Sequence, residues 1–294
     1  MIAPKPPISG HDTDMDDITG GILKLTDDLA LTRMGYGAMR LTGPGIWGPP
    51  KDPAEAIRVL RTVADLGLLH IDTSDYYGPY VVNDLIREAL YPYPSGLRIV
   101  TKVGARRGDD RSWFPAMTEP ELIEAVYDNL KRLDVEQLDV VNLRMHDTSD
   151  PTIPFSVLTA LQDEGLIAHL GVSNVTEDQL LICRGIAPVV CVQNEYNLVN
   201  RGDDALVDIC AENGIAYVPF FPLGGFSPLQ SEILDEVAQD LGATRQQTAL
   251  AWLLQRSPTI CVIPGTSSVA HLKENVAASG IRFSEIASQR LNAL

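Results

Sequence analysis

The stretch Ile71-Asp72-Thr73-Ser74-Asp75-Tyr76-Tyr77-Gly78 decides the fold and carries the first candidate chemistry. It follows a short apolar run and ends in glycine, which is typical of a strand that runs into a loop. Asp72 closes the strand and Tyr77 follows five residues later, so both side chains can face one pocket. A second apolar run ends in Lys102, where a neighbouring parallel strand would leave the sheet.

These three side chains together are typical of a proton-donor site. A phenol with a pKa of about 10 is a poor acid near neutrality unless a fixed cation stabilises its phenolate. We expect Asp72 to hold Lys102, and Lys102 to make Tyr77 a better acid. A Schiff-base role for Lys102 is the alternative, and its pairing with Asp72 and Tyr77 favours the first interpretation.

The rest of the chain alternates between strand-like and helix-like segments without a break in composition. This alternation predicts the α/β class and a single (β/α)8 TIM barrel. A doubly wound sheet is the alternative, but the expected glycine motif after its first strand is missing. The predicted strands are 34–38, 68–72, 98–102, 138–143, 169–173, 189–193, 216–220 and 260–263, and the predicted helices are 53–66, 81–89, 119–133, 155–164, 177–185, 203–213, 243–257 and 269–278.

The N-terminal part of the chain differs from the remainder. Residues 1–20 are rich in proline and then in aspartate, which predicts a flexible acidic tail before a barrel domain spanning 21–294. The spacing of Asp12, Asp14 and Asp16 is similar to that of a calcium loop, but the sixth position lacks glycine and the twelfth lacks glutamate. Residues 22–31 contain enough strand formers for a short hairpin.

Composition excludes several classes of partner. The 294 residues carry a formal net charge of −16, which argues against nucleic acid and against anionic membranes. The four scattered cysteines, Cys183, Cys191, Cys210 and Cys261, have no metal-binding spacing and are expected to be buried free thiols. No leader and no 18-residue apolar run occurs, so we expect a cytoplasmic protein with a small-molecule partner.

Polar side chains gather where the predicted strands end. Active sites of such barrels lie at the C-terminal ends of the strands. A purely structural role does not readily explain why so many polar or aromatic side chains gather at this end of the barrel. The residues at or just past predicted strand ends are Asp72, Lys102, Arg144, Ser173, Asn174, Gln193 and Phe220.

Several blocks of sequence resemble the aldo-keto reductases. Asp72-Thr-Ser-x-x-Tyr77-Gly and Thr101-Lys102 are followed by Gly171-Val-Ser-Asn174, Gln193, Pro222-Leu-Gly224 and Ile263-Pro-Gly-Thr-Ser-Ser268. The resemblance runs from about residue 34 to 275. Gly35-Tyr-Gly-Ala-Met39 and Asp139-Val-Val-Asn-Leu-Arg144 are similar to the bacterial branch that includes pyridoxal reductases.

The resemblance implies a catalytic set of Asp72, Tyr77, Lys102 and a fourth group that is histidine in the family. The register of the preceding helix puts Arg144 at that position, with His146 as the alternative two residues later. Arginine keeps its charge and can polarise a carbonyl oxygen, but it does not titrate. With Lys102 and Arg144 beside it, we expect the pKa of Tyr77 to lie below its usual value of about 10.

The resemblance further implies NADPH as the cofactor and no metal. The hydroxyl-rich turn before the last helix is suited to a 2′-phosphate. Gly265 and His271 stand where many members have cations, so Lys273 is the only permanent cation nearby in the sequence. The implied cofactor-binding residues are Gly37, Ala38, Met39, Ser173, Asn174, Gln193, Phe220, Pro222, Leu223, Gly224, Gly265, Thr266, Ser267, His271, Glu274 and Asn275.

The implied activity is reduction of an aldehyde, pyridoxal to pyridoxine in the first instance, with Tyr77 as proton donor. Trp47, Trp113 and His146 are candidate substrate contacts. The arginines at 106, 107 and 111 could contact cofactor or substrate, or simply be solvated. A reductase of another aldehyde or ketone, or a cofactor-sensing barrel without activity, are the alternatives. The sequence predicts no oligomeric state.

Overall fold

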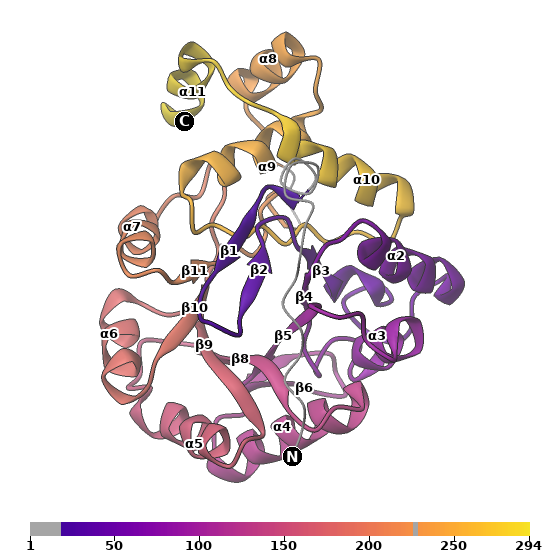
Figure 1. Ribbon diagram of the computed structural model, residues 1–294, viewed down its shortest axis with the longest axis vertical. Helices are drawn as coiled ribbons and strands as arrows, with labels where there is room; N and C mark the ends of the chain where they lie inside the picture. Colours follow the sequence, from indigo (N-terminus) through magenta and orange to yellow (C-terminus); the bar gives the residue numbers. More distant parts are fainter. Residues whose placement is uncertain (1–18, 226–228) are drawn as a thin grey trace.

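The computed structural model describes residues 19–225 and 229–294. Seven parallel strands form one curved sheet, surrounded by helices (Figure 1). The register of neighbouring strands is continuous, for example from Lys102 opposite Asn142 to Arg144 opposite Ser173. In hydrogen-bonded order the strands are β3 (Tyr36–Gly37), β4 (His70–Asp72), β5 (Arg98–Val103), β8 (Leu138–Arg144), β9 (Ile167–Ser173), β10 (Val189–Gln193) and β11 (Ala216–Tyr217).

An eighth segment closes this sheet into a barrel. Ile260 pairs in parallel with Tyr217 of β11, and Val262 pairs in parallel with Met34, just before β3. The backbone bonds Cys261 N–Tyr217 O and Gly35 N–Val262 O measure 2.9 and 2.8 Å. The prediction of a single (β/α)8 barrel is confirmed, with the last strand reduced to these bridges.

The eight predicted helices are present, with small shifts at their ends. Capping residues fix several starts: the Asp52 carboxylate accepts from Glu55 N at 2.9 Å, and Thr118 and Thr176 each form a capping box. The bounds are α2 (Pro53–Asp65), α3 (Val81–Leu90), α4 (Glu119–Leu133), α5 (Thr152–Asp163), α6 (Glu177–Ile186), α7 (Asp204–Glu212), α9 (Arg245–Arg256) and α10 (Val269–Ala277).

The N-terminal hairpin closes one end of the barrel. Strands β1 (Ile22–Lys24) and β2 (Ala30–Thr32) pair antiparallel, as predicted, and lie across the barrel in Figure 1. Leu29 and Leu31 are buried against interior side chains that include Val100 and Val140. Because Asp28 contacts Arg98 and His169 near the starts of β5 and β9, the hairpin covers the N-terminal ends of the strands and leaves the opposite mouth open.

Other elements were not predicted. A second hairpin, β6 (Ala105–Arg107) with β7 (Trp113–Pro115), follows β5, and helices α8 (Glu232–Leu241) and α11 (Glu285–Asn292) are added outside the repeat. The 3-10 turns η1 (Ala38–Leu41) and η2 (Ala278–Gly280) follow β3 and α10. The predicted tail, with its calcium-like run, lies almost wholly outside the described residues. Thr19 is buried and accepts a bond from Met34 N at 2.7 Å.

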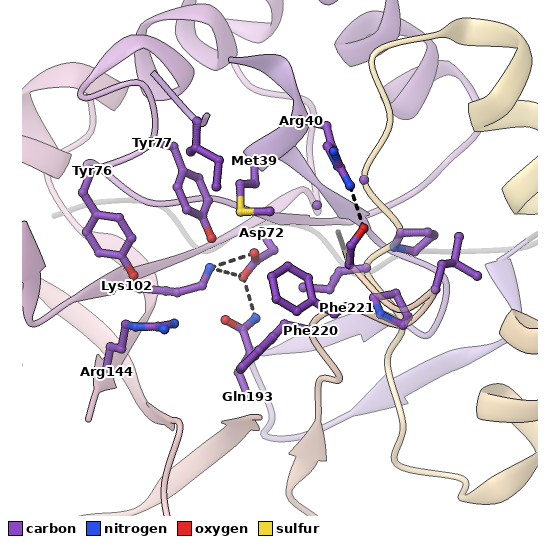
Figure 2. Close-up of a pocket in the computed structure, with 18 of the residues that line it drawn as sticks. Met39, Arg40, Asp72, Tyr76, Tyr77, Lys102, Arg144, Gln193, Phe220 and Phe221 are labelled. Atoms are coloured by element: carbon purple, nitrogen blue, oxygen red, sulfur yellow. Dashed lines mark hydrogen bonds and ion pairs between the residues drawn. The ribbon is translucent and has the colours of Figure 1, made fainter. Parts of the chain in front are cut away.

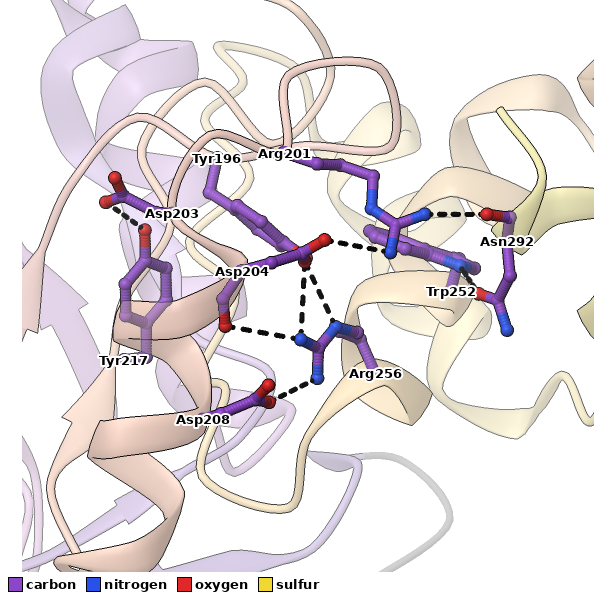
Figure 3. Close-up of polar contacts among 9 residues, drawn as sticks. All are labelled: Tyr196, Arg201, Asp203, Asp204, Asp208, Tyr217, Trp252, Arg256 and Asn292. Carbon is purple, nitrogen blue, oxygen red and sulfur yellow. Dashed lines mark hydrogen bonds and ion pairs between the residues drawn. The ribbon is translucent and has the colours of Figure 1, made fainter.

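A polar network fastens α11 to the barrel (Figure 3). Arg201 donates to the carbonyl of Asn292 at 2.9 Å, and the indole of Trp252 donates to the Asn292 side chain at the same distance. Arg256 binds Asp208 at 2.8 Å. These contacts hold the loop that leads from β10 to α7, and thereby one side of the barrel mouth.

The four cysteines are buried free thiols, as expected. In the described parts of the chain, no helix is long and apolar enough to cross a membrane.

Candidate active site

A buried ion pair lies at the ends of β4 and β5. Lys102 Nζ contacts both carboxylate oxygens of Asp72, at 2.7 and 2.8 Å, and donates to the carbonyl of Thr73 at 2.9 Å. Asp72 and Lys102 are only 3% and 2% exposed. Leaving either charge alone at this depth would be strongly unfavourable, so the pair is locked in one arrangement.

Gln193, at the end of β10, joins this pair from across the barrel. Its Nε2 donates to Asp72 Oδ2 at 2.8 Å, so the carboxylate is held by two strands besides its own (Figure 2). The amide oxygen of Gln193 faces the other way and is buried without a partner. The orientation of Gln193 is therefore fixed, and its acceptor is free for a bound molecule.

Tyr77 reaches the ion pair from the loop after β4. A turn in which Tyr77 N donates to Ser74 O at 3.2 Å brings the ring back over the barrel mouth. Lys102 Nζ lies 5.3 Å from the centroid of the Tyr77 ring, and both line the same cavity. The predicted association of Asp72, Lys102 and Tyr77 is thus present in the structure.

The expected direction of the Tyr77 pKa is wrong. Burial raises the pKa of this phenol above its usual value, and the charge of Asp72 raises it further, while Arg144 lowers it by less. Lys102 is paired with Asp72, so its cationic charge is largely neutralised at the ring. Tyr77 therefore keeps its proton over the physiological range.

Of the two candidates for the fourth position, Arg144 lines the cavity. Its side chain leaves the end of β8 and its Cζ lies 5.9 Å from the centre of the Phe220 ring. His146 instead points its Nε2 at the carbonyl of Gly104, at 2.9 Å, and is half-buried there. Burial lowers the pKa of His146 below its usual range.

The cavity at the barrel mouth has a volume of about 340 Å³ (Figure 2). Strand ends form its floor, and the loops after β3, β5 and β11 form its walls. Among the predicted site residues, it brings together Gly37, Met39, Asp72, Tyr77, Lys102, Trp113, Arg144, Gln193, Phe220, Pro222, Leu223 and Gly265.

Other predicted residues are not part of the cavity lining. Ser173 is fully buried with an unpartnered hydroxyl, whereas the Asn174 side chain donates to Met145 O at 2.9 Å. Trp47 packs on Arg107, whose guanidinium lies 5.4 Å from the Trp47 ring and 4.1 Å from Trp113. The remaining residues of this kind are Ala38, His146, Gly224, Thr266, Ser267, His271, Glu274 and Asn275.

The arginines of the β6–β7 hairpin have defined partners. Arg107 donates to the carbonyls of Ile46 and Gly45, at 2.8 and 3.1 Å, and so ties the hairpin to the loop after β3. Arg106 pairs with Glu124 at 2.6 Å. The sequence leaves contact with a ligand and free solvation open for these arginines, and in the structure Arg106 and Arg107 have protein partners.

Several cavity residues were missed from the sequence as binding residues. Arg40, on η1, crosses the cavity rim to donate to Gly225 O at 2.9 Å. Its position two residues beyond the predicted first strand was a signal that could have been used. The other missed lining residues are Ile46, Phe221, Gly225, Ile263 and Pro264.

Glycine is required where two backbones approach at the rim. A Cβ on Gly37 would lie 2.6 Å from the carbonyl oxygen of Ile263, and one on Gly265 would lie 2.8 Å from that of Gly37. Any larger residue would push the first and last strands apart. The close approach leaves backbone rather than side chains at Gly37 and Gly265, both of which line the cavity.

The first turn of α10 contains more charge than the sequence suggested. Glu55 accepts from Val269 N at 3.1 Å and is itself paired with Arg58. Lys273 is therefore not the only cation near this turn. Arg58 is bonded to Glu55, which contacts Val269, and the Arg40 side chain lies beside Gly265.

A model of the Aldo/keto reductase family matches residues 33–294. The chain belongs to the aldo-keto reductase family. It is 59% identical to pyridoxine 4-dehydrogenase of Escherichia coli over 263 residues, which cover 87% of this chain and 92% of that relative. It is 44% identical to an uncharacterized oxidoreductase of Schizosaccharomyces pombe, covering 92% of this chain and 88% of that protein.

The fold agrees with solved members of the family. A thermostable aldo-keto reductase, determined in complex with the inhibitor epalrestat, superposes with a TM-score of 0.78 and is 29% identical, covering 90% of this chain and 96% of that structure. The resemblance inferred from the sequence motifs is confirmed, and the chain is an oxidoreductase of this family. Within the described residues, no group of three or more histidine, cysteine or acidic side chains is placed to hold a metal ion.

Proposed function

We propose that this reductase uses NADPH to convert an aldehyde to an alcohol, with pyridoxal as its substrate and pyridoxine as its product. The similarity to the E. coli pyridoxine 4-dehydrogenase supports the choice of substrate. The observation that carries the chemistry is the buried Asp72–Lys102 pair beside a protonated tyrosine in an open cavity.

Tyr77 is the proton donor in this proposal. When bound, NADPH supplies the hydride that reduces the carbonyl carbon. Negative charge then develops on the carbonyl oxygen, and a phenol positioned at that oxygen can neutralise it by donating its proton. Because the pKa of Tyr77 is raised, the proton is present whenever substrate arrives.

Lys102 and Arg144 stabilise the developing charge from two sides. Lys102 is held by Asp72 and the Thr73 carbonyl, so it presents its charge without reorientation. Arg144 adds a permanent cation in place of the family's histidine and has no proton to exchange. The side chains thus have separate roles, since Tyr77 gives the proton and the two cations stabilise the oxygen and the remaining tyrosinate.

The cavity floor fits the carboxamide of a nicotinamide. A carboxamide needs both a donor and an acceptor. The Gln193 amide oxygen belongs to a residue of the cavity lining and is buried and unpartnered; the Ser173 hydroxyl is also buried and unpartnered, and Ser173, although not part of the lining, lies opposite Gln193 in the register of β9 and β10. The Phe220 ring lines the cavity and offers its face for stacking on the nicotinamide. We assign Asn174 a supporting place there through its bond to Met145 O.

We propose that the other end of the cofactor passes Gly37 and Gly265 toward α10. The close approach of Gly37 and Gly265 leaves backbone rather than side chains along that path. Met39, the Pro222–Gly224 loop and the Thr266–Ser267 turn border it, while His271, Glu274 and Asn275 belong to the adenine end. Arg40 and Arg58 supply the positive charge for the phosphates that the sequence alone did not locate.

A substrate and cofactor screen tests this function. The purified protein is assayed with pyridoxal, benzaldehyde, a linear aldehyde and a ketone, each with NADPH and with NADH. We expect pyridoxal with NADPH to give the highest kcat/KM. Preference for another carbonyl would contradict the assigned substrate, and equal dissociation constants for the two cofactors in a fluorescence titration would contradict a 2′-phosphate site.

The same screen separates the alternatives. A cofactor-sensing barrel without activity would bind NADPH tightly and consume none with any aldehyde. A Schiff-base enzyme would be trapped at Lys102 by borohydride, although its ion pair with Asp72 opposes the neutral amine that such chemistry needs. The cytoplasm remains the predicted location.

A further inference from the structure

The guanidinium of Arg144 is an uncommitted cation in the cavity wall. Its Nε is buried without a partner, and within residues 19–225 and 229–294 no carboxylate pairs with this side chain. The nearest acid of the site, Asp72, is already bound by Lys102 and Gln193. Arg144 is partly buried and its Nε is removed from water, and such a charged donor favours an anionic acceptor supplied by a ligand.

A second unpartnered donor, the hydroxyl of Tyr76, lies on the same side of the cavity. Tyr76 is 3% exposed and its oxygen has no hydrogen-bond partner. Edge contacts with Tyr77 and Trp113, at centroid distances of 5.4 and 5.5 Å, fix the ring. Figure 2 shows its hydroxyl directed toward the side chains of Lys102 and Arg144. Burial raises the pKa of Tyr76, so it acts as a donor.

Both donors belong to residues that line the same cavity as Tyr77 and Lys102. In the proposed reaction Tyr77, Lys102 and the charge of Arg144 act on the carbonyl oxygen, and the buried Nε of Arg144 and the Tyr76 hydroxyl remain available for a group that the substrate carries next to it. Neither group would be satisfied by an unsubstituted ring. A buried donor that loses its partner costs free energy, so the cavity discriminates against ligands that lack an oxygen there.

We infer that Arg144 and Tyr76 form a binding site for an oxyanion adjacent to the reacting carbonyl, so that the preferred substrates are aromatic aldehydes with an ionised ortho-hydroxyl group. The inference rests on the proposed aldehyde reduction and names its substrate class. Pyridoxal belongs to that class, because its hydroxyl is adjacent to its aldehyde. The arginine then has a role in recognition that a neutral histidine could not fill.

Three isomeric or truncated aldehydes test this site. The kcat/KM with NADPH is measured for 2-hydroxybenzaldehyde, 3-hydroxybenzaldehyde and benzaldehyde. We expect the ortho isomer to exceed the other two by roughly tenfold or more. In Tyr76→Phe and Arg144→Met this ratio should fall to about threefold or less, and Arg144→Lys should restore part of it. Tyr127→Phe, an exposed tyrosine on α4, should keep the wild-type ratio.

A binding measurement gives a readout that needs no turnover. In Tyr77→Phe the aldehyde binds without reacting, and the ionised form of 2-hydroxybenzaldehyde absorbs at longer wavelength than the neutral form. We expect a difference spectrum of the phenolate at pH values where the free aldehyde is neutral, and its loss in Tyr77→Phe/Arg144→Met.

The outcomes separate this inference from the function on which it rests. Equal kcat/KM values for the three aldehydes in the wild type would overturn the oxyanion site and leave the reductase intact. Reduction of none of them would contradict the proposed function. The difference spectrum would still decide the inference in that case, since a bound neutral phenol would refute it.

Discussion

Tyr77 holds its proton because two effects oppose its ionisation. The ring is removed from water, and the nearest carboxylate, Asp72, disfavours a second negative charge beside it. The ammonium of Lys102 compensates for Asp72 rather than for the phenolate. In the proposed reaction, the cost of moving the proton would be offset only when negative charge develops on a substrate oxygen.

The raised pKa of Tyr77 predicts the alkaline side of the activity profile. An acid whose pKa lies above 10 stays protonated below that value, so kcat/KM for reduction should remain flat between about pH 7.5 and 9.5. Arg144 does not titrate, and the pKa of His146 is lowered, so His146→Ala should leave the profile unchanged. A fall in kcat/KM centred below pH 9, in saturating NADPH, would show that Tyr77 ionises too easily for this interpretation.

Asp75, in the same loop, predicts a pH dependence of stability. Burial raises the pKa of this carboxyl to about 7, with the charge of Asp128 adding to the effect while its bond from Ser74 and the charge of Arg106 oppose it. Because the folded protein binds this proton more tightly than the unfolded chain, the carboxyl contributes its full stabilisation below the unfolded pKa of about 4. This stability is lost as the pH rises through 7.

Asp75→Asn should remove that loss. From pH 5 to pH 8, the free energy of unfolding of the wild type should fall by roughly 2–3 kcal/mol more than that of the variant. Urea unfolding of both proteins at the two pH values measures this change. A constant difference between them would mean that Asp75 is ionised in the folded protein at both.

At the scale of elements, one arginine connects the closing strand to the helix before it. Arg33 donates to the carbonyls of Ser257 and Ile260, at 2.7 and 3.2 Å, and also binds the carbonyl of Leu254 near the end of α9. The carbonyls of Leu254 and Ser257 belong to the C-terminal end of α9, and that of Ile260 belongs to the closing strand segment. Because the last strand contributes only two bridges, this contact substitutes for missing ladder hydrogen bonds.

Arg33→Met should therefore destabilise the barrel. Loss of a charged donor to buried carbonyls is expected to lower the free energy of unfolding by about 2–3 kcal/mol, measured in urea. Arg58→Met is the matched control: its ion pair with Glu55 is largely exposed, so about 1 kcal/mol or less is expected. Equal losses in the two variants would argue against the closing role of Arg33.

The elements that the sequence predicted are those with local signals. Helices such as α4 and α6 carry a capping box and a repeating apolar face, and the strands before Asp72 and Lys102 are compact apolar runs. The β6–β7 hairpin lacks such a signal. Its two strands are three residues long, and it is held by Arg107 through contacts with loop carbonyls more than fifty residues away in the chain.

At the scale of the whole molecule, several cationic side chains line one cavity of a protein whose net charge is strongly negative. The net charge is −16, yet Lys102, Arg144 and Arg40 line one cavity whose lining acid, Asp72, is already paired. Strand-end positions made the first two predictable. The position of Arg40 was also a usable signal, but its contact with Gly225 and the contact of Glu55 with Val269 were not predictable, because these partners are brought together only when the first and last strands meet.

The depth to which each side chain is buried could not be predicted from the sequence either. The pKa of Tyr77 was expected to fall because two cations lie near it, and it rises because the ring is enclosed and Lys102 is neutralised. The identity of the groups was predictable from motif and register. Their protonation depends on how much water the folded barrel excludes.

The most direct measurement is single-turnover reduction of pyridoxal by Tyr77→Phe, with the NADPH dissociation constant determined on the same protein. The ring is kept and only the proton is removed. We expect the rate to fall at least about a hundredfold while the dissociation constant changes less than about threefold. A variant that reduces pyridoxal at the wild-type rate would show that the proton comes from another group and that Tyr77 is not the acid.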